Sequence, residues 1–257
     1  ATSAAAAKEI GTSADRVLVS STGVIGRRLP IEKIEAGLVG MSSDLQPDPL
    51  VGAAGIMTTD THPKATSARV AGSDATITWV AKGSGMIEPN MATMLVYLMT
   101  DAELPKAALR PMLRRVVDRT FNCMSIDTDT STSDTVVLMA NGLAGKVKLA
   151  QFEKGLLQVC EYLTREIARS GEGATKLIIA DVKGAKTTTQ AKRVAKCVVN
   201  SPLVKTAVYG CDPNWGRVIM AVGKSFDPSI DPAKVTIRFG ATNVFKKGSP
   251  VDCDLEA

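Results

Sequence analysis

The segment from Lys82 to Leu95, KGSGMIEPNMATML, contains residue types that could carry out acyl chemistry. Its glycine-rich turn and Pro89 lead into an apolar run that begins with the small-residue pair Ala92 and Thr93. A threonine hydroxyl is a weak nucleophile until a neighbouring base accepts its proton. Spacing alone favours the plainer interpretation, in which Thr93 is a β-branched residue at the start of a strand.

The sequence offers only one histidine that could serve as that base. His62 precedes Pro63 in a turn-like stretch. Any Ser-His-Asp or Cys-His mechanism would rest on this residue alone, so we expect a base other than imidazole.

Two common binding motifs begin in the sequence and are not completed. Gly83-x-Gly85 lacks the third glycine of a dinucleotide-binding fingerprint, because Glu88 occupies that position. The tract that starts at Asp127 looks like a calcium-binding loop, but it lacks the glycine at the sixth position and the glutamate at the twelfth. We therefore expect no nucleotide cofactor and no metal ion.

The composition is typical of a globular protein: the 257 residues are 45% hydrophobic and carry a net charge of +5. Basic residues are spread along the chain among 26 carboxylates, so the sequence does not support nucleic-acid binding. The five cysteines lie far apart and never form a Cys-x-x-Cys pair, which favours reduced thiols. No apolar run is long enough to cross a bilayer. We expect a soluble, cytoplasmic protein with no membrane contact.

Hydrophobic patterning divides the chain into short apolar strands and amphipathic helices, the arrangement of an α/β protein. We expect strands at Val17–Ser20, Thr76–Val80, Thr93–Met99, Thr135–Ala140, Lys176–Val182 and Val235–Phe239. We expect helices at Pro30–Val39, Pro111–Phe121, Phe152–Ser170 and Thr188–Val199. Breakers near residues 181–186 predict a boundary between a catalytic core at residues 1–185 and a smaller α/β portion at residues 186–257.

Six sequence blocks, taken in order, resemble the ornithine acetyltransferase (glutamate N-acetyltransferase) family. They cover nearly the whole chain and include the segment from Lys82 to Leu95. The other blocks are Ser21–Gly26, Ile56–Thr61, Asp127–Asp134, Glu172–Lys176 and Asn200–Gly216. Ordered matches of this length are much more specific than any single motif.

The resemblance implies an Ntn-hydrolase-like fold, a layered α-β-β-α sandwich, and a precursor that cuts its own chain. The matching bond lies between Ala92 and Thr93, so Thr93 would become the first residue of a second chain. Its new α-amino group would have an unperturbed pKa of about 7.7–8.0 and could take the proton from the hydroxyl of the same residue. The nucleophile would thus carry its own base.

The same resemblance implies roles for several other residues. Thr22 and Gly23 would supply the oxyanion hole that stabilises the tetrahedral intermediate. The residues that would line the amino-acid pocket are Thr58 or Thr59, Lys82 and Glu172. Lys82 suits a substrate carboxylate, and Glu172 suits the ornithine ammonium.

The implied reaction is a ping-pong transfer of acetyl from N2-acetyl-L-ornithine to Thr93 and then to L-glutamate, with no cofactor. Use of acetyl-CoA as a further donor stays open. One alternative is an amidohydrolase or aminopeptidase of the same self-cleaving fold, in which water resolves the acyl-enzyme. The other is an inactive fragment of the enzyme.

The resemblance also carries expectations about the whole protein. Family members are longer at both ends, and a later segment contributes an Asn and a Thr to the substrate site, so we expect the portion at residues 186–257 to be incomplete at its C-terminus. The family suggests a heterotetramer of two cleaved α and two β chains. A eukaryotic source would place the protein in the mitochondrial matrix or a plastid.

Overall fold

A four-stranded sheet forms the centre of the protein in the computed structural model, which describes residues 1–90 and 93–253. Its strands lie in the order β1 (Lys64–Arg69), β2 (Thr76–Lys82), β3 (Leu95–Thr100) and β4 (Thr135–Ala140). The first three strands are antiparallel, whereas β4 runs parallel to β3. The register pairs Lys82 with Leu95, so the end of β2 lies beside the residues that follow Thr93.

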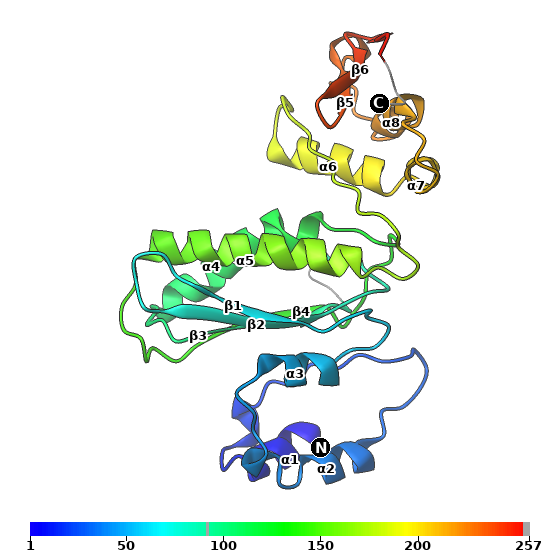
Figure 1. Ribbon diagram of the computed structural model, residues 1–257. Helices are drawn as coiled ribbons and strands as arrows, with labels where there is room; N and C mark the ends of the chain where they lie inside the picture. The colour runs from blue at the N-terminus through cyan, green and yellow to red at the C-terminus, as the bar shows by residue number, and fades with distance from the viewer. Residues whose placement is uncertain (91–92, 254–257) are drawn as a thin grey trace.

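Helices α4 (Lys106–Arg119) and α5 (Leu149–Arg169) cover one face of this sheet (Figure 1). The helix α5 buries an apolar stripe with the period of an α-helix, formed by Phe152, Leu156, Val159, Cys160, Leu163 and Ile167. Together with the inward side chains of β2 and β3 and the buried side of α4, this stripe makes up the main hydrophobic core. The core therefore supports the ends of the strands that carry the predicted site.

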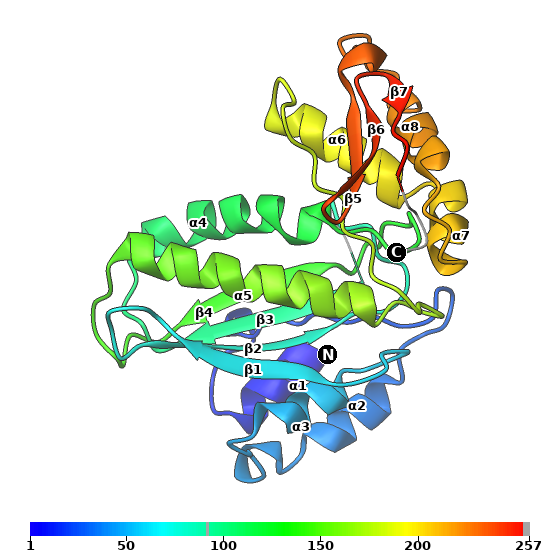
Figure 2. The same ribbon diagram turned by 45° about the horizontal axis from the view of Figure 1, so that its top comes forward.

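The N-terminal helices lie on the other side of the sheet (Figure 2). Helix α3 (Pro49–Gly55) packs against β1 and β2, whereas α1 (Thr2–Glu9) packs against α2 (Ile31–Leu38). Asp48 caps α3 by accepting a hydrogen bond from the amide of Leu50 at 2.9 Å. Helices thus occupy both faces of the sheet.

The C-terminal residues gather around two small apolar clusters of their own. The elements are α6 (Thr188–Val199), α7 (Pro202–Tyr209), α8 (Trp215–Gly223), β5 (Thr236–Phe239), β6 (Thr242–Lys246) and β7 (Ser249–Pro250). One cluster joins the three helices, and the other packs α8 against the small sheet, where Trp215 stacks on Phe245 with ring centroids 5.1 Å apart. Figure 1 shows α6, α7, α8, β5 and β6 on the far side of α4 and α5 from the large sheet.

The α/β class predicted from the sequence is confirmed, and most predicted elements are present. The helix predicted at Thr188–Val199 has those bounds in the structure, and the helices at Pro30–Val39 and Phe152–Ser170 differ by a few terminal residues. The strands predicted at Val17–Ser20 and Lys176–Val182 are wrong, because neither segment pairs with a neighbouring strand within the described residues.

One helix begins earlier than the pattern indicates. The sequence predicts a start at Pro111, yet α4 already begins at Lys106 and contains Pro111 in its interior. Proline removes one backbone donor from a helix. The burial of Met112, Val116 and Val117 on α4 outweighs that loss.

Candidate active site

The loop at residues 83–90, which leaves β2, contains a tight turn that one carboxylate binds. Asp127 accepts hydrogen bonds from the backbone amides of Met86, at 2.6 Å, and Ile87, at 2.9 Å. Met86 has a φ of 56°, in the left-handed region that non-glycine residues rarely adopt. Asp127 thus stabilises this turn, and no cluster of potential metal ligands occurs among residues 1–90 and 93–253.

A buried ion pair joins the segment after α3 to the start of the loop. Oδ1 of Asp60 accepts hydrogen bonds from Nζ of Lys64, at 2.8 Å, and from the amide of Gly83, at 2.7 Å. Lys64 also donates to the hydroxyl of Ser170, just after α5, at 3.0 Å. Burial raises the pKa of Asp60, but the hydrogen bonds from Lys64, Gly83 and Thr58 outweigh it and leave the pKa below its ordinary value. The carboxylate of Asp60 therefore favours its charged form, and its bond to the Gly83 amide fixes the end of β2.

Lys82 is a second buried cation, close to the first. The residue is 1% exposed, and its Nζ donates a hydrogen bond to the backbone carbonyl of Thr93 at 3.1 Å. Burial and the nearby charge of Lys64 hold the pKa of Lys82 below its ordinary value, although the charges of Asp60 and Asp134 act in the opposite direction. The structure thus brings together two residues of the predicted site, Lys82 and Thr93.

The hydroxyl of Thr93 is buried and has no hydrogen-bond partner in the part of the chain that the structure describes. The next amide, that of Met94, donates to Oδ1 of Asp134 at 2.9 Å, and Oδ2 of Asp134 is buried without a partner of its own. Such unsatisfied groups are rare in native proteins and require an explanation. Ala92, the other residue of the predicted cleavage bond, lies outside the described residues.

We expect the carboxyl of Asp134 to make stability depend on pH. Burial raises its pKa to about 6, although the Met94 amide and Lys82 act in the opposite direction. The folded state therefore holds the proton more tightly than the unfolded state, so the unfolding free energy should fall as pH rises from about 4 to about 6. Because Asp134 is only partly buried, the wild type should lose about 1–2 kcal/mol over this range relative to Asp134→Asn.

Urea unfolding at a series of pH values measures this difference. Asp74→Asn changes an exposed carboxylate and provides the matched control. Equal pH slopes for the wild type and Asp134→Asn would contradict the raised pKa.

Two residues of the predicted amino-acid pocket also meet. The hydroxyl of Thr59 donates to Oε1 of Glu172 at 2.6 Å, although the two are 113 positions apart. The amide of Glu172 donates to the carbonyl of Ser84 at 3.1 Å, which ties this contact to the glycine-rich loop. Thr58 instead donates its amide to Asp60 at 3.2 Å. Of the two threonines, Thr59 is therefore the one whose side chain contacts Glu172.

A cavity of about 390 Å³ lies next to Glu172, between the segment that follows α5 and helices α6 and α7. Its walls include residues 125–126, the segment 172–178 that follows α5, Val199 at the end of α6, and Lys205 and Tyr209 on α7. Thr93 and Lys82 do not line this cavity. In the uncut chain the buried contact between those two residues is therefore separate from the open space beside Glu172.

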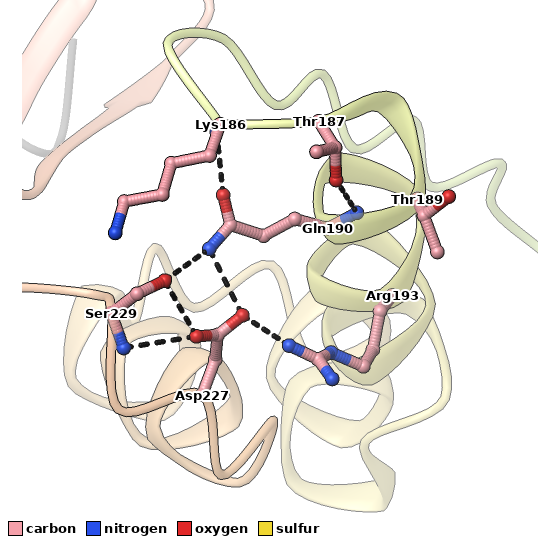
Figure 3. A pocket seen from close by; sticks show the side chains of 7 residues that line it. All are labelled: Lys186, Thr187, Thr189, Gln190, Arg193, Asp227 and Ser229. Atoms are coloured by element: carbon pink, nitrogen blue, oxygen red, sulfur yellow. Dashed lines mark hydrogen bonds and ion pairs between the residues drawn. The ribbon is translucent and has the colours of Figure 1, made fainter.

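A smaller cavity, of about 290 Å³, lies between the start of α6 and the loop that follows α8 (Figure 3). It is lined by Lys186, Thr187, Thr189, Gln190, Arg193, Asp227 and Ser229. The Asp227 carboxylate pairs with Arg193 and accepts hydrogen bonds from Ser229, at 2.7 Å, and Gln190, at 2.9 Å. Because these polar groups form hydrogen bonds with one another, we interpret them as a structural contact between α6 and the loop that follows α8.

Thr22 and Gly23, the predicted oxyanion-hole residues, lie in a segment without regular structure that precedes α2. Thr22 is half-buried and Gly23 is exposed. Within the described residues, neither forms a hydrogen bond with Thr93. The hydroxyl of Ser20 contacts that of Tyr97 on β3, which attaches this segment to the strand that follows Thr93.

Sequence reasoning misses four residues that build the site. Asp60 and Asp134 fall within the blocks at residues 56–61 and 127–134, so a signal for them was present. Lys64 and Ser170 carry no such signal, because their contact joins positions 106 apart in the chain. Only the folded structure brings them together.

Comparisons with known proteins agree with the sequence blocks. A family model described as the ArgJ family matches residues 1–257. The chain is 55% identical to "Arginine biosynthesis bifunctional protein ArgJ 2" of Nostoc sp., covering 93% of this chain and 62% of that protein. It is 52% identical to "Glutamate N-acetyltransferase Oat2" of Streptomyces clavuligerus, covering 98% of this chain and 65% of that protein.

A solved structure is also similar. The crystal structure of arginine biosynthesis bifunctional protein argJ from Bacillus halodurans has a TM-score of 0.60 and 41% identity, covering 62% of this chain and 78% of that chain. This likeness shows the predicted fold class. The chain spans 62% and 65% of the lengths of the two curated relatives named above.

Proposed function

The chain belongs to the ArgJ family, and from this premise we propose that the whole protein transfers acetyl from N2-acetyl-L-ornithine to L-glutamate through an acyl-enzyme on Thr93. The relative named a glutamate N-acetyltransferase supports this reaction. The observation that carries the proposal is the buried hydroxyl of Thr93, which has no hydrogen-bond partner among the described residues, in a residue whose carbonyl accepts a hydrogen bond from Lys82.

Self-cleavage between Ala92 and Thr93 would prepare the nucleophile. In the uncut chain, the nitrogen of Thr93 belongs to a peptide bond and has no basic lone pair. Cleavage would release it as an amine whose unperturbed pKa is about 7.7–8.0, so that it could accept the hydroxyl proton at neutral pH. It would also free the start of β3 from the loop at residues 83–90, which gives substrate a route to the buried hydroxyl.

The transfer would then proceed in two half-reactions at one site. The Thr93 oxygen attacks the acetyl carbonyl of N-acetylornithine, and ornithine leaves with a proton. The amino group of glutamate then attacks the resulting ester, the bond to the Thr93 oxygen breaks, and N-acetylglutamate leaves as the hydroxyl regains its proton. Backbone donors at Thr22 and Gly23 would stabilise the oxyanion of each tetrahedral intermediate. These steps need no cofactor or metal.

One cationic and one anionic group of the proposed site suit an amino-acid substrate. Lys82 would bind the α-carboxylate, since a buried ammonium binds a carboxylate strongly where water is excluded. Glu172, oriented by Thr59 at 2.6 Å, would bind the side-chain ammonium of ornithine. Acetyl-CoA remains an untested further donor.

The family assignment extends to location and assembly. We propose a cytoplasmic enzyme assembled as a heterotetramer of two cleaved α and two β chains. Among the helices of the described residues, none has both the length and the apolar character that a membrane span requires.

Intact mass spectrometry of the full-length protein tests the proposal. After incubation with N-acetylornithine, we expect a fragment that begins at Thr93 to gain the mass of one acetyl group, and glutamate should remove it. Acetate release that glutamate leaves unchanged would point instead to an amidohydrolase of the same fold. The absence of any adduct would contradict the acyl-threonine.

A further inference from the structure

The carboxylate of Glu88, in the loop before Thr93, holds a set of hydrogen bonds that the transfer chemistry does not use. Its Oε2 accepts from the hydroxyl of Ser125, at 2.8 Å, and from the side-chain amide of Asn200, at 2.8 Å. Its Oε1 accepts from Nζ of Lys196 at 3.2 Å. One carboxylate therefore binds three groups from distant parts of the chain.

Two of the partners of Glu88 belong to the C-terminal portion, and the third, Ser125, belongs to the segment that precedes β4. Lys196 lies on α6 and Asn200 directly follows that helix. The side chains of Glu88 and Lys196 are only 23% and 16% exposed, and Nζ of Lys196 also donates to the carbonyl of Met124 at 2.6 Å. Hydrogen bonds of this kind are stronger than those of exposed ion pairs because water competes less for the charges.

These contacts join two parts of the molecule that have separate hydrophobic cores. The core around α4, α5 and the large sheet contains no residue of α6, whose apolar side packs on α7 and α8. Other connections near this point are also polar, such as the hydrogen bond from Lys205 to the carbonyl of Ile126 at 2.7 Å. The placement of α6 over the loop therefore depends on charged and polar groups, with Glu88 at their centre.

Two of these polar residues, Ser125 and Lys205, line the cavity beside Glu172. Val199 lines it as well, and Ser125 donates to Glu88. A shift of α6 would move Val199 and the start of α7, and with them one wall of this cavity. The side of the cavity formed by Glu172 would stay with α5 and the core.

We propose that Glu88 is a positioning residue for substrate binding. It holds α6 and α7 against the loop at residues 83–90, so that the cavity beside Glu172 keeps the shape that fits the amino-acid substrate. This role rests on the proposed acetyl transfer. Glu88 precedes the predicted cleavage bond and its three partners follow it, so after cleavage the contact would join the two chains. Glu88 itself touches no reacting atom.

Steady-state kinetics of the cleaved full-length enzyme test this role. We expect Glu88→Ala to raise KM for N-acetylornithine about tenfold while kcat changes by less than about twofold, as befits a lost set of charge-assisted hydrogen bonds outside the chemistry. Lys196→Met should raise KM similarly. Because the two act as a pair, the double variant should raise KM no further than the larger single effect.

Glu153→Gln provides the matched control, since Glu153 forms an ion pair with Arg115 between α4 and α5 at 2.8 Å, away from the cavity. Its KM should equal that of the wild type. If Glu88→Ala does not fold, Glu88→Gln and Lys196→Met give the same comparison with smaller changes in shape.

Wild-type KM in the Glu88 variants, or additive effects in the double variant, would overturn the positioning role. Wild-type protein that fails to transfer acetyl would instead overturn the proposed function, and so the two failures are distinguishable.

Discussion

Replacing Thr93 by alanine should leave the full-length protein as a single uncut chain and lower acetyl transfer by about 10⁴-fold to 10⁶-fold, the range found when a catalytic nucleophile is removed. The methyl group of alanine cannot attack either the peptide bond or the acetyl donor. Loss of the hydroxyl should not unfold the protein, because that oxygen forms no hydrogen bond in the described chain. A denaturing gel and a transfer assay measure the two effects.

Two further variants make this result specific. Thr93→Ser keeps the hydroxyl and should still be cut and active, although more slowly if the methyl group orients the oxygen. Thr66→Ala removes an exposed threonine from β1 and should behave as the wild type. A Thr93→Ala protein that is cut and active would refute the assignment of the nucleophile.

Replacing Lys82 by methionine should lower kcat/KM for N-acetylornithine about 100-fold, mainly through KM. The ammonium is buried and donates to the carbonyl of Thr93 at 3.1 Å. In the variant, water would therefore not easily replace the ammonium as a hydrogen-bond donor to the substrate carboxylate. Removing one partner from a buried charged contact typically costs about 2–5 kcal/mol, which corresponds to at least a 30-fold loss. Methionine is close to lysine in length, which limits the change in packing.

A thermal melt should accompany this assay, because the charge of Lys82 also acts on Asp60 and Asp134. Lys154→Met, which changes an exposed lysine on α5, is the matched control and should keep wild-type kinetics. Unchanged KM in a folded Lys82→Met protein would show that this lysine does not bind the substrate.

The sequence predicts the elements of this fold well wherever periodicity reflects burial. The stripe on α5 and the apolar runs of β2 and β3 are strong signals, because each element buries one face in the same core. The run at Val17–Ser20 has the same residue types, yet it pairs with no strand among residues 1–90 and 93–253. Local composition does not reveal whether a strand has a neighbour.

The site is less predictable than the fold. Resemblance to a family predicts Lys82, Thr93 and Glu172 as site residues. The contact between Thr59 and Glu172 and the ion pair of Asp60 with Lys64 depend on how loops meet in space. The role of Asp127 illustrates the difference: its tract suggests a calcium loop, whereas its carboxylate binds the amides of the turn at Met86. A motif indicates which groups are present and leaves their partners undetermined.

The pairing of β2 with β3 has a consequence for the cut protein. The two strands are hydrogen-bonded neighbours over six pairs of residues, from Ile77 with Thr100 to Lys82 with Leu95. The proposed scission falls in the connection between them. Each product would therefore contain one of the two paired strands, and both strands would still pack on the same hydrophobic core. Pulling them apart would expose both halves to water, and an affinity tag on either product should therefore retrieve the two together.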